Sequence, residues 1–330
     1  MNKLILIPFL ISALVTAFLI PLWIKKCKKN KMLLEDMNKY GSPKNVATSG
    51  GLLVIAGFVL GVLFYVALST FYFGGKDSSI EIFALLTTIL ILGIVGLIDD
   101  LWGWKTGGLS NTFRLGLAVV ASIPLMVINA GTHSMSLPIV GSVEFGIFYP
   151  LILIPLGVAG AATTYNFLAG FNGLEAGQGI LIISFLSYVS YVSGSSWLAI
   201  VGMCMVFALG VFFVFNKFPA KIFPGDILTY SVGALIAIMA ILGNYEKIAV
   251  IAFVPYILET GLKVRGKLNK YSFGVPDKEG NLKLPYEKIY SLNHWAILIL
   301  NKFGSASEKK VTYVIYLIQV LFIFLAYLAL

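Results

Sequence analysis

The sequence predicts an all-α polytopic membrane protein with about ten transmembrane helices. Hydrophobic residues make up 58% of the 330 residues, charged residues make up only 12%, and the mean hydropathy is +0.91. Apolar runs of about twenty residues recur along the chain, and a run of that length spans the hydrocarbon core as a helix. The alternating pattern of a transmembrane β-barrel is absent from the sequence, so helices are expected to satisfy the backbone in lipid.

The first apolar run covers residues 4–24 and is followed at once by five lysines, the last of them Lys31. A secretory signal carries its charge before the apolar core and a cleavage site after it, so this run is expected to be a retained anchor. We therefore expect one integral membrane domain over residues 1–330. Nine further runs follow, at residues 48–73, 80–98, 112–130, 145–164, 177–192, 197–215, 227–242, 248–262 and 311–330.

The distribution of basic residues predicts the orientation of these helices. Ten spans place both termini on one side and leave five connections on the other, at residues 25–47, 99–111, 165–176, 216–226 and 263–310. With Arg114 at the edge of the fourth run, these connections hold all but three of the 24 Lys and Arg residues, the exceptions being Lys3, Lys76 and Lys247. By the positive-inside rule, the connections are expected to be cytoplasmic and both termini external, in the plasma membrane. Topology and contact with anionic lipid already account for many of these charges.

The polar residues that stand out all fall in the predicted cytoplasmic connections. They are the adjacent pair Asp99 and Asp100, then Asn166, the group 172–175, and Asp226. Carboxylate and amide oxygens suit a hard cation such as Mg²⁺, and basic side chains nearby would suit a phosphate-bearing substrate. Neither histidine is placed to favour zinc. Two simpler interpretations stay open, a solvated helix cap for the aspartate pair and a helix N-terminal acid for Asp226.

The last connection is the longest segment outside the membrane. Residues 271–276 and 281–284, on either side of a turn, are expected to form two short strands. Residues 286–300 are expected to form an amphipathic helix on the membrane surface, with aromatic and aliphatic side chains such as Tyr290 toward lipid. The sequence therefore predicts a small cytoplasmic hairpin and helix before the last span.

Residues 166–178, Asn-Phe-Leu-Ala-Gly-Phe-Asn-Gly-Leu-Glu-Ala-Gly-Gln, closely resemble the signature of the polyprenyl-phosphate N-acetylhexosamine-1-phosphate transferases, which are of glycosyltransferase 4 type. The pair Asp99 and Asp100 resembles the paired aspartates of that family, and Phe-Pro-Gly before Asp226 resembles the context of its later metal-binding aspartate. The run that begins at Arg114 is similar to the one in which the family carries a basic residue. The resemblance is closest to the eukaryotic and archaeal UDP-GlcNAc:dolichyl-phosphate GlcNAc-1-phosphate transferases.

This resemblance implies transfer of an N-acetylhexosamine-1-phosphate, GlcNAc-1-phosphate first of all, from a UDP-sugar to polyprenyl or dolichyl phosphate, with release of UMP. It implies the first step of lipid-linked oligosaccharide assembly and Mg²⁺ as cofactor, with Mn²⁺ as a substitute. A loop that resembles the eukaryotic type in a short chain rich in Ile and Lys indicates an archaeal source. The expected partners are the two substrates and membrane lipids, without nucleic acid, and a homodimer is left open. The chemistry agrees, because attack of one phosphate on another gathers negative charge that a divalent ion and basic side chains must neutralise.

The resemblance also implies roles for individual residues. Asp226 and Asn166 are expected to bind the metal. Asp99 is expected to orient or deprotonate the acceptor phosphate, and Asp100 to hold the metal or a positive side chain. Two adjacent carboxylates disfavour simultaneous ionisation unless a cation lies nearby, which agrees with a metal there. Arg114 stands where relatives commonly have lysine, and it is expected to contact a phosphate, including that of the lipid, without acting as a base.

The signature loop is expected to bind the nucleotide-sugar. Asn172 resembles the asparagine that meets the uracil ring, and Gly170 and Gly173 would let the backbone approach that ring. Leu174 belongs to the same string, and Glu175 is expected to support the loop.

Two features of the basic connections complete the predicted site. Lys44 is a candidate for the lipid phosphate, with a simple membrane-edge role as the alternative. Residues 272–276 lack the arginine pair that the eukaryotic branch carries before an Ile-Pro step, and His294 lacks the second histidine of the bacterial branch. The missing charge is expected to come from four bases just upstream, namely Lys263, Arg265, Lys267 and Lys270.

Other classes of protein stay open from the sequence alone. An ion-coupled secondary transporter would show inverted halves and acids at mid-span, whereas these acids lie at span ends on one side. A Mg²⁺-dependent phosphatase or nuclease would share the three aspartates but would not need ten spans. Within the family, a bacterial-type undecaprenyl-phosphate sugar-1-phosphate transferase is the remaining alternative.

Overall fold

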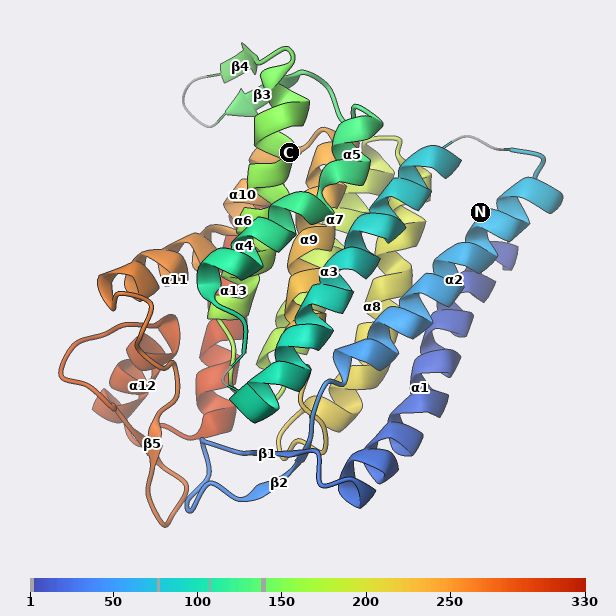
Figure 1. Cartoon of the computed structure of the whole chain (residues 1–330). Coiled ribbons are helices and arrows are strands. Elements are labelled where there is room, and N and C mark those ends of the chain that lie inside the picture. The colour runs from blue at the N-terminus through green and yellow to red at the C-terminus, as the bar shows by residue number, and fades with distance from the viewer. Residues whose placement is uncertain (1–2, 76–77, 107, 138–140) are drawn as a thin grey trace.

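The computed structural model describes residues 3–75, 78–106, 108–137 and 141–330 and is built mainly of helices (Figure 1). Lys76, from the charge count, and Gly107, from the second predicted connection, lie outside the described residues. The helices are α1 (Leu6–Lys29), α2 (Gly51–Phe71), α3 (Ser79–Thr106), α4 (Asn111–Ala121), α5 (Ile123–Val127), α6 (Ile154–Phe167), α7 (Leu174–Val192), α8 (Ser196–Asn216), α9 (Asp226–Gly243), α10 (Glu246–Ala252), α11 (Val254–Arg265), α12 (Leu292–Lys302) and α13 (Glu308–Leu328), with short helical turns at Lys3–Ile5 and Tyr149–Leu153. The strands form antiparallel pairs of β1 (Leu33–Glu35) with β2 (Lys44–Ala47), β3 (Ser134–Leu137) with β4 (Gly141–Glu144), and β5 (Val275–Pro276) with β6 (Leu282–Lys283).

Seven of the described helical segments are long and apolar enough to cross a membrane. Each coincides with a predicted span, so the all-α polytopic class is confirmed, while ten crossings stay a prediction. The seven segments are Lys3–Lys29, Gly51–Phe71, Ser79–Gly103, Tyr149–Phe167, Ser196–Asn216, Asp226–Gly243 and Glu308–Leu328.

The other three predicted spans are helical but depart from a single long apolar helix. The span predicted over 112–130 is divided into α4 and α5 just before Pro124, and the span over 248–262 is divided into α10 and α11 just before Pro255. Proline lacks a backbone N–H and suits the first turn of a helix, and each of these prolines is the second residue of a new helix. The third, α7, is continuous over 19 residues but carries several serines and tyrosines.

Helix α9 lies at the centre of the bundle, and fifteen of its 18 residues are buried. It packs against α3 and α6, and glycine allows both contacts. A Cβ at Gly96 of α3 would lie 2.5 Å from the backbone nitrogen of Ile227, and a Cβ at Gly233 would lie 2.5 Å from the carbonyl oxygen of Ala161 in α6. Because close-packed interiors leave no room for such overlaps, larger side chains would push the helices apart. The contact at Gly96 therefore also fixes the distance between the end of α3 and the start of α9.

The predicted connections meet at one end of the bundle, the lower end in Figure 1. Ala47 pairs with Ile222, which joins the first and fourth connections. The side-chain amide of Asn38 donates to the carbonyl oxygen of Gly170 at 2.7 Å and accepts the backbone N–H of Gly274 at 3.2 Å. One buried side chain thus ties the first connection to the third and the fifth, whereas β3 and β4 lie at the opposite end of the molecule.

The hairpin predicted in the last connection is confirmed as β5 and β6, but the predicted start of the following helix is wrong. The helix expected over 286–300 begins only at Leu292, so Tyr290 precedes it. The side chain of Ser291 caps α12, and the carboxylate of Glu259 in α11 accepts the backbone N–H of Leu292 at 2.6 Å. Free N–H groups at a helix start need such partners, and a partner on a distant helix leaves no local sequence signal.

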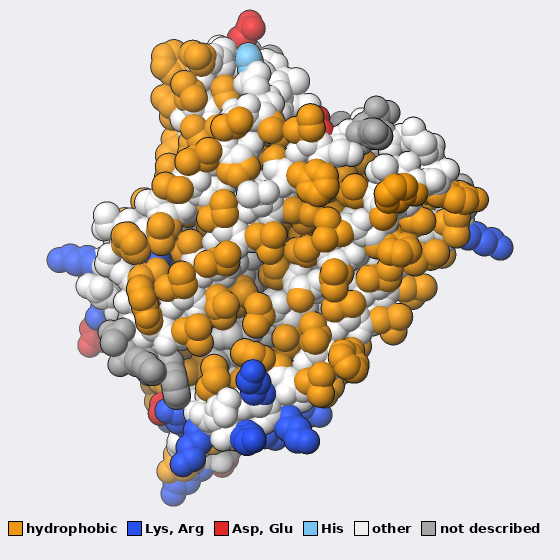
Figure 2. Space-filling view, turned by 45° about the vertical axis from the view of Figure 1, so that its right-hand side comes forward, with side chains coloured by type: hydrophobic (Ala, Val, Ile, Leu, Met, Phe, Trp, Pro, Cys, Tyr) orange, Lys and Arg blue, Asp and Glu red, His pale blue; other side chains and the backbone are white. Residues whose placement is uncertain are grey.

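Figure 2 shows a broad hydrophobic surface along the bundle, with Lys and Arg side chains gathered at the end where the connections meet. Large apolar side chains on this surface are strongly exposed, among them Phe18 on α1, which is 70% exposed. An apolar surface this extensive marks contact with lipid rather than with water. The chain is therefore a multi-pass membrane protein.

Candidate active site

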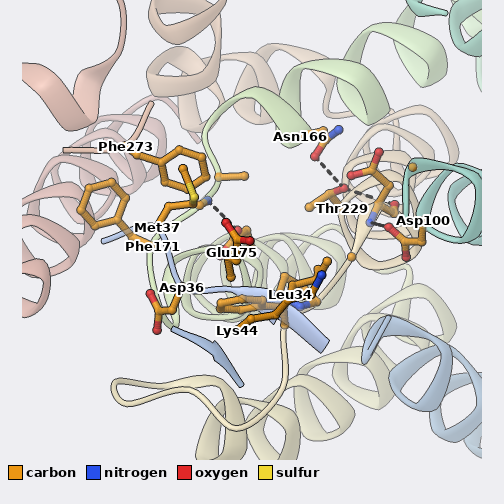
Figure 3. A pocket seen from close by; sticks show the side chains of 18 residues that line it. Leu34, Asp36, Met37, Lys44, Asp100, Asn166, Phe171, Glu175, Thr229 and Phe273 are labelled. Carbon is orange, nitrogen blue, oxygen red and sulfur yellow. Dashed lines mark hydrogen bonds between the residues drawn. The ribbon is translucent and has the colours of Figure 1, made fainter. Parts of the chain in front are cut away.

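A cavity of about 520 Å³ lies at the end of the bundle where the connections meet (Figure 3). Segments far apart in the chain form its walls: the first connection, the ends of α3 and α6, the loop before α7, the start of α9, and the segment before β5. Its lining residues are Leu34, Glu35, Asp36, Met37, Lys44, Asp100, Gly103, Asn166, Ala169, Gly170, Phe171, Glu175, Phe223, Pro224, Gly225, Asp226, Thr229 and Phe273. Six of the predicted site residues are among them, namely Lys44, Asp100, Asn166, Gly170, Glu175 and Asp226.

The packing of α3 on α9 brings Asp100 and Asp226 together. The backbone N–H of Asp226 donates to Asp100 Oδ1 at 2.7 Å. Gly225, just before α9, has φ +73°, and a Cβ there would lie 2.2 Å from Asp100 Oδ2. Glycine is therefore needed at this position both for the backbone conformation and for the close approach of the Asp100 carboxylate.

Arg114, on the first turn of α4, joins Asp99 to Asp226. Its Nη1 lies 2.9 Å from Asp99 Oδ2 and 3.5 Å from Asp226 Oδ2, and it donates to the Tyr230 hydroxyl at 3.3 Å. The other oxygen of Asp99 accepts the backbone N–H of Leu109 at 2.6 Å. With both oxygens engaged and only 5% of the residue exposed, Asp99 lies beside the cavity and does not line it.

Asn166, near the end of α6, faces the cavity together with Thr229 of α9 (Figure 3). The Thr229 hydroxyl is 3.1 Å from Asn166 Oδ1 and 3.2 Å from the carbonyl oxygen of Asp226, one turn earlier on the same helix. Because a hydroxyl has one hydrogen, it donates to one of these oxygens at a time. Thr229 thus orients the Asn166 amide beside the first turn of α9.

The oxygens at this end of the cavity fit a hard divalent cation. Asp100, Asn166 and Asp226 present two carboxylates and an amide, the ligand types that Mg²⁺ prefers. Asp100 Oδ2 is buried and accepts no hydrogen bond from the described residues, and a buried carboxylate oxygen left in this state calls for a partner such as a cation. In the part of the chain that is described, no group of three or more His, Cys, Asp or Glu side chains forms a metal site by itself. The candidate metal site therefore combines two carboxylates with the side-chain amide of Asn166.

The signature loop is held by acidic side chains. Glu175 accepts the backbone N–H of Gly170 at 2.8 Å and so holds the loop against the start of α7. Asn172 is only 5% exposed and does not line the cavity. Its backbone N–H donates to Glu308 at 2.8 Å, and its side-chain amide donates to Asp36 at 3.2 Å. The structure therefore places Asn172 inside the loop and Asp36 on the cavity side.

Four other predicted residues lie away from the cavity. The carbonyl oxygen of Gly173 accepts the hydroxyl of Tyr316, and Leu174 is fully buried behind the loop. Arg265 and Lys267 are exposed at the end of α11 and are not among the lining residues.

The remaining two of the four upstream bases contact other residues of the last connection. The ammonium of Lys263 donates to the Ser272 hydroxyl at 2.5 Å and to the carbonyl oxygen of Lys270 at 3.1 Å. The ammonium of Lys270 lies 4.7 Å from the centroid of the Tyr286 ring. These contacts hold the segment that places the Phe273 ring against Gly170.

Sequence reasoning missed several residues of the cavity wall. Thr229 carries a usable signal, because it is a polar residue one helical turn after Asp226. Asp36 is an acid in a lysine-rich connection, which is also a signal. Met37 and Phe273 carry none, since an apolar residue in a loop does not reveal which surface it will face.

Comparison with known proteins identifies the family. Residues 82–244 match glycosyl transferase family 4. The chain is 34% identical over 325 residues to a protein of Saccharolobus solfataricus described as a candidate UDP-N-acetylglucosamine–dolichyl-phosphate N-acetylglucosaminephosphotransferase, covering 98% of this chain and 95% of that protein. This chain belongs to glycosyl transferase family 4.

Two less similar relatives carry different names. The UDP-N-acetylglucosamine–dolichyl-phosphate N-acetylglucosaminephosphotransferase of Dictyostelium discoideum is 26% identical over 321 residues, covering 86% of this chain and 74% of that protein. A phospho-N-acetylmuramoyl-pentapeptide-transferase of Halalkalibacterium halodurans is 28% identical over 288 residues, covering 81% and 86%. Family 4 membership makes the chain a transferase and gives no support to the transporter or hydrolase alternatives.

The part of the chain that matches the family contains one end of the cavity, here called the acidic end, and not the wall opposite it. Asp100, Asn166 and Asp226 fall within residues 82–244, whereas Lys44 and Phe273 fall outside. The first and last connections are therefore the parts of the cavity wall that the family match does not cover.

Proposed function

We propose that this family 4 transferase moves GlcNAc-1-phosphate from UDP-GlcNAc to dolichyl phosphate. The proposal depends on one observation, the convergence of Asp100, Asn166 and Asp226 on a single cavity at the end of a membrane bundle. The names of the Saccharolobus and Dictyostelium relatives support the choice of donor and acceptor. In the reaction, an oxygen of dolichyl phosphate attacks the phosphorus that carries the sugar, and the bond from that phosphorus to UMP breaks.

The position of the cavity suits substrates that arrive from two phases. We place the five connections in the cytoplasm, because they hold most of the Lys and Arg residues. UDP-GlcNAc then reaches the cavity from the cytoplasm, and dolichyl phosphate reaches it from the adjoining leaflet. Lys44, which lines the cavity, is the base that we assign to a substrate phosphate.

The acidic end of the cavity has separate tasks for its residues. Mg²⁺ held by Asp226, Asn166 and Asp100 would neutralise the diphosphate and the charge that develops on UMP as it leaves. Asp100 lines the cavity, and its buried Oδ2 has no hydrogen-bond partner among the described residues, so we assign to it the role of orienting the acceptor or holding the cation. Asp99 fixes Arg114, whose guanidinium can then bind a phosphate without losing its charge.

The proposal is tested with purified protein, UDP-GlcNAc labelled in the sugar, dolichyl phosphate and Mg²⁺. Label should enter the organic phase and UMP should appear in equal amount, and omission of dolichyl phosphate should stop both. UMP release without lipid would instead indicate a hydrolase. Asp226→Asn should abolish turnover with an unchanged unfolding temperature, because it removes a charged ligand without opening a cavity. Near-normal turnover of this variant would overturn the metal assignment.

Chelation provides the matching test of the cofactor. EDTA should stop transfer, and added Mg²⁺ or Mn²⁺ should restore it. Full activity in EDTA would show that the cavity works without a divalent ion.

A further inference from the structure

A second cavity, of about 380 Å³, lies at the same end of the bundle, between the end of α1 and the end of α8. It shares no lining residue with the active-site cavity. Its lining residues are Pro21, Ile24, Lys25, Lys28, Phe215 and Lys221. Half of them are lysines and the other half are apolar.

The three lysines form a concentrated positive charge. Lys25 and Lys28 lie one turn apart on the same face of α1, and Lys221 comes from the loop between α8 and α9. None of the three forms an ion pair with a described carboxylate, and the lining contains no acid. Like charges gathered around one cavity repel one another unless an anion lies between them. The cavity therefore has the charge of an anion-binding site.

The three apolar lining residues, here called the floor, come from α1 and α8, which also carry exposed apolar side chains. Pro21 and Ile24 precede the lysines on α1, and Phe215 lies at the end of α8. On the same two helices, Leu22 is 54% exposed and Val214 is 59% exposed. A ligand here meets positive charge at its head and apolar side chains along its body.

We propose that this cavity binds an anionic glycerophospholipid of the surrounding leaflet, with the phosphate among the three lysines and the first acyl carbons over Phe215. Free phosphate shares the charge but cannot use the apolar floor. Dolichyl phosphate shares both features, so the experiment must separate it from a phospholipid. Lysines near a membrane surface each contribute to attraction of anionic lipid, and three together favour it over a zwitterionic lipid.

The site is built on the segment that leads to the catalytic cavity. The carbonyl oxygen of Lys221 accepts the backbone N–H of Ala47 at 3.3 Å, and the amide of Asn216 donates to the carbonyl oxygen of Ile222 at 2.9 Å. Asp226 follows five residues after Lys221. A lipid held by Lys221 would steady this loop and the start of α9, so anionic lipid should raise the rate of transfer. This last step rests on the proposed function, whereas the binding itself does not.

Binding is tested by native mass spectrometry of the full chain in detergent, with phosphatidylglycerol offered against phosphatidylcholine. The variant K25Q/K28Q/K221Q removes the site, and K26Q/K29Q/K31Q is its control, because it removes the same charge from lysines that do not line the cavity. Wild type and control should retain phosphatidylglycerol, and the site variant should bind it at least about tenfold more weakly. Equal loss in both variants would overturn the proposal in favour of general charge attraction.

Competition identifies the lipid. Excess inorganic phosphate should leave phosphatidylglycerol in place, and displacement by inorganic phosphate would overturn the lipid assignment. Dolichyl phosphate should compete poorly, and displacement at equal concentration would reassign the cavity to the acceptor. In bilayer nanodiscs, phosphatidylglycerol should raise the turnover of wild type and control but not of the site variant. Absence of turnover in every nanodisc would contradict the proposed function and leave the binding result standing.

Discussion

The substitution Gly225→Ala tests how the two aspartates of the cavity are held together. Gly225 has φ +73° and ψ 169°, a conformation that is essentially reserved for glycine and costs other residues about 1–3 kcal/mol. The added Cβ would lie 2.2 Å from Asp100 Oδ2. A carbon and an oxygen in contact normally lie roughly 3.3 Å apart or more, so the Asp100 carboxylate must move by about 1 Å.

That movement has a predictable effect on the reaction. It breaks the hydrogen bond of 2.7 Å from the Asp226 backbone to Asp100 and moves one proposed cation ligand away from another. Displacement of a reacting or binding group by about 1 Å costs roughly a hundredfold in rate. We therefore expect Gly225→Ala to lower kcat about a hundredfold and to lower the free energy of unfolding by about 2 kcal/mol.

The measurement combines the transfer assay with thermal unfolding followed by intrinsic fluorescence. Gly210→Ala, in α8, is the matched control, because no described atom beyond its own stretch of helix lies within 4 Å of its added Cβ, and alanine stabilises a helix by up to about 1 kcal/mol relative to glycine. The control should keep full activity and an equal or higher unfolding temperature. Activity of Gly225→Ala within about threefold of wild type would refute the reasoning, since it would mean that the spacing of the two aspartates does not limit the reaction.

Three further predictions concern the metal site, the last connection and the topology. Thr229→Val keeps the side-chain shape but removes the hydroxyl that orients the Asn166 amide, so it should raise the Mg²⁺ concentration that gives half-maximal rate about fivefold. Thr229→Ser, which keeps the hydroxyl, should leave that concentration unchanged. The same Mg²⁺ dependence in Thr229→Val and wild type would contradict this role. Burial lowers the pKa of His294 to about 4, so the unfolded chain takes up a proton more readily than the folded one. The free energy of unfolding should therefore fall by about 3 kcal/mol as the pH drops from above 6.5 to 4. His294→Gln should lose that component in unfolding measurements across the same range, and identical pH profiles would exclude it. Both native cysteines are buried, so a single introduced cysteine can report the orientation of the chain. Lys278→Cys should react with a membrane-impermeant thiol reagent only after the membrane is permeabilised, whereas Glu144→Cys should react from outside without permeabilisation. The reverse pattern would invert the proposed orientation.

The sequence was sufficient for the helical class, the hairpin before the last helix and the meeting of the polar connections, because each depends on a strong local pattern. A long apolar run can satisfy its backbone hydrogen bonds in lipid only as a helix. The distribution of Lys and Arg predicts on which side of the membrane each end of the helix lies. The number of crossings was less accessible. Pro124 and Pro255 interrupt two of the runs, and the sequence does not say whether the two pieces still cross the membrane as one.

Within the site, the sequence identified residue types better than orientations. Asp99 and Asp100 are adjacent, and only the rotation of α3 against α9 decides that Asp100 lines the cavity while Asp99 is engaged by Arg114. Asn172 is turned inward by two acids, Asp36 and Glu308, that are each 136 residues away in the chain. Contacts between residues so far apart in the chain produce no local sequence pattern. The roles that the resemblance implies can therefore be assigned only when the partners of each residue in the structure are known.

The residues of the cavity wall lie far apart in the sequence, and this affects when the wall can form during synthesis. One buried amide, that of Asn38, bonds to Gly170 and to Gly274, so the wall closes only when the ribosome has passed the last connection. A nascent chain that stalls in the translocon after α9 already contains all three acidic-end residues but lacks Phe273. The wall opposite Asp100, Asn166 and Asp226 therefore depends on a segment that is made after all three of them.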